Sequence, residues 1–178
     1  MQKTSASKRY AKALFELSLE NNLTTEILTD LSFIFDLLKS NKNLEMLTSN
    51  PTIKKSSKKQ IFVNTFAEKI NKITLNFLLL VINKGREAYL ADLINKYTEI
   101  YNNHNQISVI EVVSAKRLTD EQKNIITAKV STGNNRKIYL KEQIDPDLIG
   151  GVIIKNDGVQ YDASIRKKLK NARRAFKL

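Results

Sequence analysis

Apolar residues in the first hundred positions recur at helical spacing. Between residues 5 and 101 they fall three or four positions apart in six segments, and no segment before residue 105 alternates as a strand does. The predicted inward positions are Ala6, Tyr10, Ala13, Leu14 and Leu17; Ile27, Leu28, Leu31, Ile34, Phe35 and Leu38; Leu44 and Leu47; Ile61, Phe62, Thr65 and Phe66; Ile73 to Ile82; and Leu90, Leu93, Ile94, Tyr97, Ile100 and Tyr101. Six such helices predict a bundle.

Residues that start and end helices separate these segments. Pro51 disfavours helical backbone at Asn50, and Gly85 suits the left-handed position that follows a helix. The hydroxyl side chains expected to cap helices are Ser5 or Ser7, Thr24 or Thr25, and Ser56 or Ser57. Because residues 73–82 are apolar nearly all round, we expect them to form a central helix surrounded by the others.

The pattern changes after a polar stretch at residues 102–106. This stretch (NNHNQ) lacks periodicity and is predicted to be a linker or domain boundary, with His104 solvated. Strands are then expected at residues 107–113, 137–144, 152–155 and 159–161, with a hairpin turn at Asn156-Asp157-Gly158. A turn is expected at residues 145–147.

Two helices are predicted within this second half. Thr119 and Gln122 have the spacing of a capping box for a helix carrying Ile125, Ile126 and Val130. Asp162 or Ser164 is expected to cap a final helix, whose apolar face carries Ile165, Leu169, Ala172 and Phe176. The predicted fold class is therefore mostly α: an N-terminal six-helix bundle (residues 1–105), then a small α+β domain (residues 106–178) ending in a basic helix.

Charge points to an acidic partner without identifying it. The formal net charge is +12, and lysine is abundant enough for biased base composition to explain part of it. Residues 1–105 carry 15 basic and 10 acidic side chains, and residues 106–178 carry 15 and 8. The last sixteen residues hold seven basic side chains and no acidic one. Such a helix can bind nucleic acid, an anionic membrane or an acidic protein, or can simply be solvated.

Residues suited to catalysis are scarce. There are no cysteines and one histidine, which excludes thiolate metal sites and multi-histidine sites. Gly150-Gly151 lacks the Lys-Ser or Lys-Thr of a phosphate-binding loop. The aspartates at 145, 147, 157 and 162 fit turns and caps. We expect no catalytic residue, metal or cofactor. A small-molecule enzyme is a further hypothesis, and it would require a polar pocket that the sequence does not indicate.

No stretch has the composition of a membrane span. The most apolar window, residues 77–82, is far shorter than the roughly 20 residues that cross a bilayer. The basic N-terminus faintly resembles a transit peptide, but its apolar pattern continues into the first helix. We therefore expect a soluble, intracellular protein that can dock at a membrane.

Motifs along the whole chain resemble one family. The run from Ile144 to Lys155 (IDPDLIGGVIIK), followed by Asp162-Ala163-Ser164, is similar to the signature of the delta subunit of F-type ATP synthases. The mitochondrial counterpart is the oligomycin-sensitivity-conferring protein. Residues 10–15 (YAKALF) and 83–86 (NKGR) resemble its first helix and its junction between the fifth and sixth helices. Ala163 departs from the glycine that the family often has there.

The resemblance implies a stator subunit without catalytic activity. In that family the N-terminal domain binds the N-terminal helix of an alpha subunit on the catalytic head, and the C-terminal part binds the b subunits of the peripheral stalk. The resemblance implies one copy per complex, located peripherally at the cytoplasmic face of the bacterial inner membrane and not bound to nucleic acid. This subunit would hold the head still while proton flow turns the rotor. The alternative is a basic nucleic-acid-binding protein using the C-terminal helix.

Candidate contact residues follow from the family's groove between the first and fifth helices. They are Tyr10, Ala13, Leu14, Leu17, Leu80 and Lys84. For each apolar residue among them, the alternative is a position in the core of the bundle. This alternative weighs more for Leu14 and Leu17 than for Tyr10 and Ala13. Four further residues are assigned structural roles in the second domain: Gly150, Gly151, Asp162 and Ser164.

Overall fold

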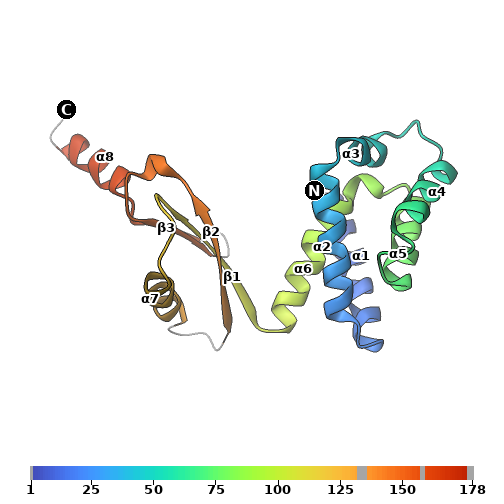
Figure 1. Ribbon diagram of the computed structural model, residues 1–178, viewed down its shortest axis with the longest axis horizontal. Helices are drawn as coiled ribbons and strands as arrows, with labels where there is room; N and C mark the ends of the chain where they lie inside the picture. The colour runs from blue at the N-terminus through green and yellow to red at the C-terminus, as the bar shows by residue number, and fades with distance from the viewer. Residues whose placement is uncertain (1, 132–135, 157–158, 176–178) are drawn as a thin grey trace. The chain divides into compact units, whose positions relative to one another are not determined.

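The fold is known from a computed structural model that describes residues 2–131, 136–156 and 159–175 (Figure 1). The chain separates between Tyr101 and Asn102 into two compact units, which are described one at a time. The predicted fold class is confirmed, since helices precede a small α+β unit that ends in a helix.

Helices make up the first unit. They are α1 (Gln2–Glu20), α2 (Thr24–Ser40), α3 (Lys42–Ser49), α4 (Lys55–Phe66), α5 (Lys72–Asn83), the short 3-10 helix η1 (Glu87–Tyr89) and α6 (Leu90–His104). All six predicted helices are present, and α3 ends before Pro51 as expected.

The predicted caps of these helices are wrong. Ser5 and Ser7 lie inside α1, while α2 and α4 begin after Leu23 and Lys54 without a side-chain cap. Asparagines cap two other helices: the side chain of Asn41 accepts the N–H groups of Asn43 and Leu44, and that of Asn71 accepts the N–H of Ile73. Where tertiary packing already stabilises a helix, the helix begins where its apolar face begins. A side-chain cap adds only about 1 kcal/mol to the stability of the helix.

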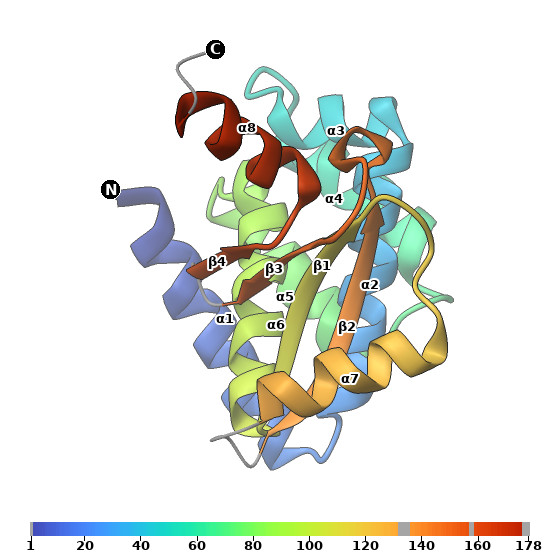
Figure 2. The same cartoon turned by 90° about the vertical axis from the view of Figure 1, so that its left-hand side faces the viewer.

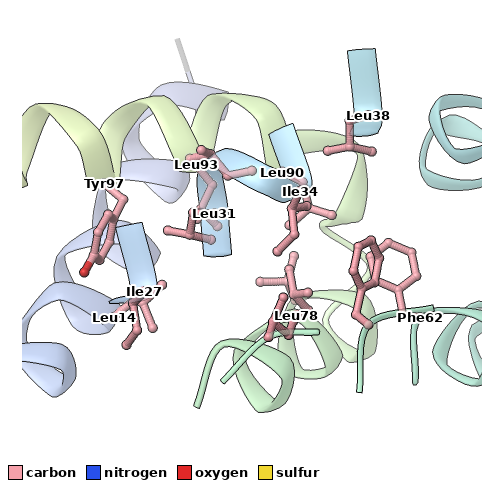
Figure 3. Close-up of a cluster of buried hydrophobic side chains, with 14 of the residues drawn as sticks. Leu14, Ile27, Leu31, Ile34, Leu38, Phe62, Leu78, Leu90, Leu93 and Tyr97 are labelled. Atoms are coloured by element: carbon pink, nitrogen blue, oxygen red, sulfur yellow. The ribbon is translucent and has the colours of Figure 1, made fainter. Parts of the chain in front are cut away.

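A single apolar core joins the helices of this unit (Figure 3). Of the inward positions predicted for α2, Ile27, Leu31, Ile34 and Leu38 are buried, while Leu28 and Phe35 are partly buried. Leu90, Leu93, Ile94 and Tyr97 of α6 are buried as well. Ile61 was expected inside but is 42% exposed. The helix α5 is not surrounded, because Leu80 is 46% exposed, although Leu78, Val81 and Ile82 are buried.

Tyr97 is the largest fully buried side chain of this core. Its hydroxyl donates toward Ser18 Oγ at 3.0 Å and the Thr24 carbonyl at 3.2 Å, which ties α6 to α1 and to the start of α2. Burial raises the pKa of Tyr97, while its hydrogen bond to Ser18 acts in the opposite direction.

Tyr97→Phe is expected to lower the free energy of unfolding of the helical unit by about 1–2 kcal/mol, because buried acceptors lose their donor. Urea unfolding followed by circular dichroism measures the change. The matched control is Tyr101→Phe, whose exposed hydroxyl lies 3.3 Å from Thr25 Oγ1 and should matter less than about 0.5 kcal/mol. Equal effects of the two variants would contradict the assigned role.

The first part of residues 102–106 is helical rather than a linker, although the two compact units do divide just before this stretch, between Tyr101 and Asn102. Helix α6 continues through Asn102 and Asn103 to His104, and only Asn105 and Gln106 form a turn. Polar residues at the exposed end of a helix that is already formed cost little, since extending a helix is far easier than starting one. Gln106, at φ 53°, ends the helical path, and the first strand follows at once.

The second unit is built on a four-stranded sheet. Its elements are β1 (Ile107–Ser114), α7 (Asp120–Ser131), β2 (Lys137–Ile144), the 3-10 turn η2 (Pro146–Leu148), β3 (Val152–Asn156), β4 (Val159–Asp162) and α8 (Ile165–Ala175). The strand order is β2-β1-β3-β4, with β1 and β2 parallel and the other pairs antiparallel. The predicted strands are confirmed, whereas Asp157 and Gly158 of the predicted turn lie outside the described residues.

Helix α7 packs on one face of this sheet (Figure 2). The predicted capping box is confirmed: Thr119 N–H donates to Gln122 Oε1 at 3.0 Å, and Gln122 N–H donates to Thr119 Oγ1 at 3.3 Å. Ile126 is buried against Ile110 and Val112 of β1, while Ile125 is 50% exposed. The same face of the sheet continues onto β4, where Tyr161 is 68% exposed.

Candidate protein-binding sites

A hollow on the helical unit contains two of the predicted contact residues. Arg9, Tyr10 and Ala13 of α1 line it together with Arg86, which follows α5, and its volume is about 320 Å³. The Arg86 guanidinium carbon lies 5.7 Å from the centre of the Tyr10 ring, within the range of a cation–π contact. The hollow thus combines an aromatic ring, a small residue and two guanidinium groups.

The chain after α5 turns sharply enough to bring Arg86 to this hollow. Gly85 has φ 65°, its N–H bonds the Ile82 carbonyl at 2.9 Å, and the Arg86 N–H bonds the Val81 carbonyl at 3.0 Å. This pair of bonds is the Schellman motif. The predicted helix end at Gly85 is therefore confirmed, and the motif fixes the direction of Arg86.

The other predicted contact residues do not line this hollow. Leu17 and Leu80 are 43% and 46% exposed, and Lys84 is exposed at the end of α5. Leu14 is 1% exposed and belongs to the core, which was the alternative given for it. The contribution of Arg9 and Arg86 was missed, because a guanidinium beside an aromatic ring depends on tertiary packing.

An apolar groove lies on the second unit between α7 and the β3–β4 half of the sheet. It has a volume of about 370 Å³. Its walls are Leu118, Gln122, Ile125, Ile126, Lys129, Val152, Ile154, Tyr161 and Ala163. The predicted sites did not include it, although Ile125 and Tyr161 are apolar residues at exposed positions of an amphipathic helix and an edge strand.

The Gly-Gly motif packs directly against the Asp-x-Ser motif. Gly151 has φ 77°, and a Cβ on it would collide with the Ala163 carbonyl oxygen; a Cβ on Gly150 would lie 2.7 Å from Ile165 Cδ1. Backbone bonds close the contact, with Ala163 N–H to the Val152 carbonyl and Ile165 N–H to the Gly150 carbonyl, both 3.0 Å. These glycines permit a close approach of two chain segments that side chains would prevent.

Ser164 starts the last helix. Its Oγ accepts the Lys167 N–H at 3.1 Å, and Asp162 Oδ1 accepts the Ser164 N–H at 2.9 Å. Hydrogen bonds from the side chain and the backbone of Ser164 lower the pKa of Asp162. The ionised Asp162 carboxylate therefore stabilises the turn fully at pH values above the ordinary pKa of aspartate. This contribution is lost as the pH falls through the lowered pKa of Asp162 in the folded protein.

Ile149 is a strained residue next to this motif. It is a β-branched residue at φ 65°, and its side chain is 65% exposed. Left-handed backbone is costly for such a residue. The apolar pattern of the strand gave no sign of it.

Helix α8 exposes both of its faces. Ile165 and Leu169 of the predicted apolar stripe are 41% and 50% exposed, and Ala172 is exposed, while Phe176 lies outside the described residues. Arg166 Nη1 is 4.0 Å from Asp145 Oδ2. The exposed basic side chains of this helix are Arg166, Lys167, Lys168, Lys170, Arg173 and Arg174.

The described residues offer neither a metal-ligand cluster nor a membrane-spanning helix. Residues 2–131, 136–156 and 159–175 hold no cluster of three or more potential metal ligands among histidine, cysteine, aspartate and glutamate. Within the same ranges no helix combines the length and the apolarity needed to cross a bilayer.

The fold thus consists of two compact units, each with a recess of its own: the hollow beside Tyr10 with its two arginines, and the apolar groove beside α7. A profile of the ATP synthase delta (OSCP) subunit family matches residues 6–176. The chain belongs to this family and is a stator component of F-type ATP synthase, a structural subunit of the complex that is not itself catalytic.

Individual relatives agree over most of the chain. It is 35% identical over 167 residues to the ATP synthase subunit delta of Prochlorococcus marinus (strain MIT 9312), covering 93% of both chains. It is 38% identical over 162 residues to the subunit delta of Gloeothece citriformis (strain PCC 7424), covering 90% of this chain and 88% of that one. A chain of the Toxoplasma gondii mitochondrial ATP synthase has the same fold, with a TM-score of 0.73, 18% identity and 97% coverage of both chains.

Proposed function

We propose that this protein links the catalytic head of a proton-translocating ATP synthase to the b subunits of its peripheral stalk. The observation that carries the proposal is that each unit has a recess of its own, so that two partners can bind at once. We also propose that residues 1–105 and 106–178 are the two domains, and that one copy sits at the cytoplasmic face of the bacterial inner membrane through the complex.

The hollow of the helical unit is proposed to bind the N-terminal helix of an alpha subunit. Ala13 permits close approach of a helix, Tyr10 offers an aromatic anchor, and the exposed Leu17 and Leu80 extend the apolar contact. Arg9 and Arg86 favour acidic residues on that helix. Nanomolar affinity needs roughly 12 kcal/mol, which a helix held in a groove by such anchors can reach.

The groove of the α+β unit is proposed to bind the far end of the stalk. An amphipathic helix laid beside α7 would cover Ile125, Ile154 and Tyr161, and so complete a second helix on that face of the sheet. Lys129 at the groove and the exposed basic residues of α8 favour an acidic partner. Torque on the head is then resisted by two protein interfaces, and no chemical step is needed.

Co-purification from membranes tests this arrangement. The tagged wild-type protein is expected to bring down the alpha, beta and b subunits. Ile125→Asp should lose the b subunits while keeping alpha and beta, because a carboxylate buried without a partner in an apolar groove costs several kcal/mol.

The matched control is Tyr139→Asp, a change at a residue that is 57% exposed and lies on the opposite face of the sheet. It should keep all three subunits. Loss of the b subunits with Tyr139→Asp but not with Ile125→Asp would mean that the stalk binds the opposite face of the sheet, and would contradict the proposed groove. Failure of the wild-type protein to recover any of these subunits would overturn the function itself.

A further inference from the structure

Three lysines at the start of α4 contact the end of α5 and the residues after it. Lys58 Nζ lies 2.6 Å from Glu87 Oε1, Lys55 Nζ donates to the Asn83 carbonyl at 3.0 Å, and Lys59 Nζ donates to Asn83 Oδ1 at 3.1 Å. By sequence alone this run (KKSSKK, residues 54–59) has the composition of a solvated basic segment.

The contact of Lys58 with Glu87 is buried. The side chain of Lys58 is 1% exposed and that of Glu87 is 9% exposed. A buried ion pair contributes little net stability compared with apolar residues of the same size, because both charges lose their hydration. Its geometry is nonetheless specific, since either charge without its partner is strongly unfavourable. A pair of this kind is suited to fixing a position.

The contact of Lys55 completes the end of α5. The last four carbonyls of a helix lack partners within it. Here the Leu80, Val81 and Ile82 carbonyls accept backbone N–H groups of residues 84, 86 and 85, at 2.9–3.0 Å. The fourth, that of Asn83, accepts the Lys55 ammonium group. This positive charge also lies at the negative end of the helix dipole.

Arg86 lies between these two attachments. Its backbone N–H is bonded to Val81 in the end of α5, and the next residue, Glu87, is held by Lys58. These bonds hold the backbone on either side of Arg86, and in the structure its guanidinium lies over the Tyr10 ring at the hollow.

We propose that Lys55, Lys58 and Lys59 form a lysine clamp that positions Arg86 against Tyr10 and so shapes the hollow where the alpha-subunit helix docks. This inference rests on the proposed function of the hollow. The lysines are positioning residues: they act through Arg86, and they do not line the hollow themselves.

The decisive variant of the full-length protein is Lys58→Met with Glu87→Leu, which removes the pair without stranding a charge. Its unfolding midpoint is expected to stay near that of the wild type. In NMR spectra of the wild type, the ring current of Tyr10 should shift the guanidinium proton signals of Arg86. In the double variant these chemical shifts should return toward the values seen in Tyr10→Leu. Affinity for a synthetic peptide of the alpha-subunit N-terminal helix should fall about fivefold to tenfold, the equivalent of one cation–π contact.

Lys96→Met with Glu99→Leu is the matched control. This pair lies on α6 with a separation of 2.8 Å and side chains 24% and 59% exposed, and its removal should change neither the Arg86 signals nor the affinity. Should the decisive variant fail to fold, Lys55→Met, an exposed residue, provides the same two measurements with a smaller expected change.

Two outcomes are kept apart by this design. Wild-type Arg86 signals and wild-type affinity in the folded double variant would overturn the clamp, because the pair would then be only structural. Absence of peptide binding by the wild-type protein would overturn the proposed function instead, and the Arg86 signals, which need no partner, would still test the clamp.

Discussion

Ala13→Asp is expected to weaken binding of the alpha-subunit N-terminal peptide by about 100-fold or more while leaving the protein folded. Ala13 is exposed on α1 and lines the hollow, so the free protein tolerates a carboxylate there. In the complex the same carboxylate would fill the space left for the helix and repel the acidic residues proposed to meet Arg9 and Arg86, at a cost on the order of 3 kcal/mol or more. Isothermal titration calorimetry with the full-length protein measures the loss.

The control for this variant is Ala67→Asp. Ala67 is an exposed alanine with helical backbone at the end of α4, far along the chain from the residues of the hollow. It should bind the peptide as the wild type does. Unchanged affinity in Ala13→Asp, with both variants folded, would remove the hollow from the alpha-subunit interface.

Gly151→Ala is expected to destabilise the α+β unit by about 3 kcal/mol or more. Left-handed backbone costs a side chain about 1–2 kcal/mol, and the added Cβ would also meet the Ala163 carbonyl and lie 3.1 Å from Ser164 Cα. Both obstacles are backbone atoms and cannot rotate away. Urea unfolding followed through amide signals of β3 reports on this unit, and signals of α5 report on the helical unit in the same sample.

Gly85→Ala separates the two costs. Gly85 also has positive φ, at 65°, but a Cβ there would meet only the end of the Lys55 side chain at 3.6 Å, an ordinary contact. Its effect should be about 1–2 kcal/mol and confined to the helical unit. Similar losses for the two substitutions would mean that the close approach of the Gly-Gly and Asp-x-Ser motifs contributes nothing.

The sequence predicted the number and order of the described α-helices and strands correctly, but not the 3-10 helix η1. Periodicity is a property of neighbouring residues, so the apolar stripes of α2 and α6 and the strands around Gly150-Gly151 were visible without a structure. Element ends were predicted less well. The α6 helix passed through residues predicted as a linker, and Ser5, Thr24 and Ser56 proved not to be caps, because packing outweighs a cap where the apolar face begins elsewhere.

The residues that line the two recesses could be foreseen only in part, for a related reason. Tyr10 and Ala13 were chosen from the resemblance to the family and do line one hollow, but Leu14 is buried in the core and Arg86 completes the hollow from outside α1. The apolar groove beside α7 depends on which strands α7 leaves exposed, and this follows from the sheet order rather than from any one segment.

The sequence alone therefore determined the local elements, the division into a helical and an α+β half, and the family signature, because each of these depends on residues that are close together along the chain. Only the tertiary structure decided that Lys58 is buried against Glu87, that Arg86 lies over Tyr10, and that Gly151 meets Ala163. Those contacts join residues separated by many positions, and long-range packing, which no local pattern encodes, selects which face meets which.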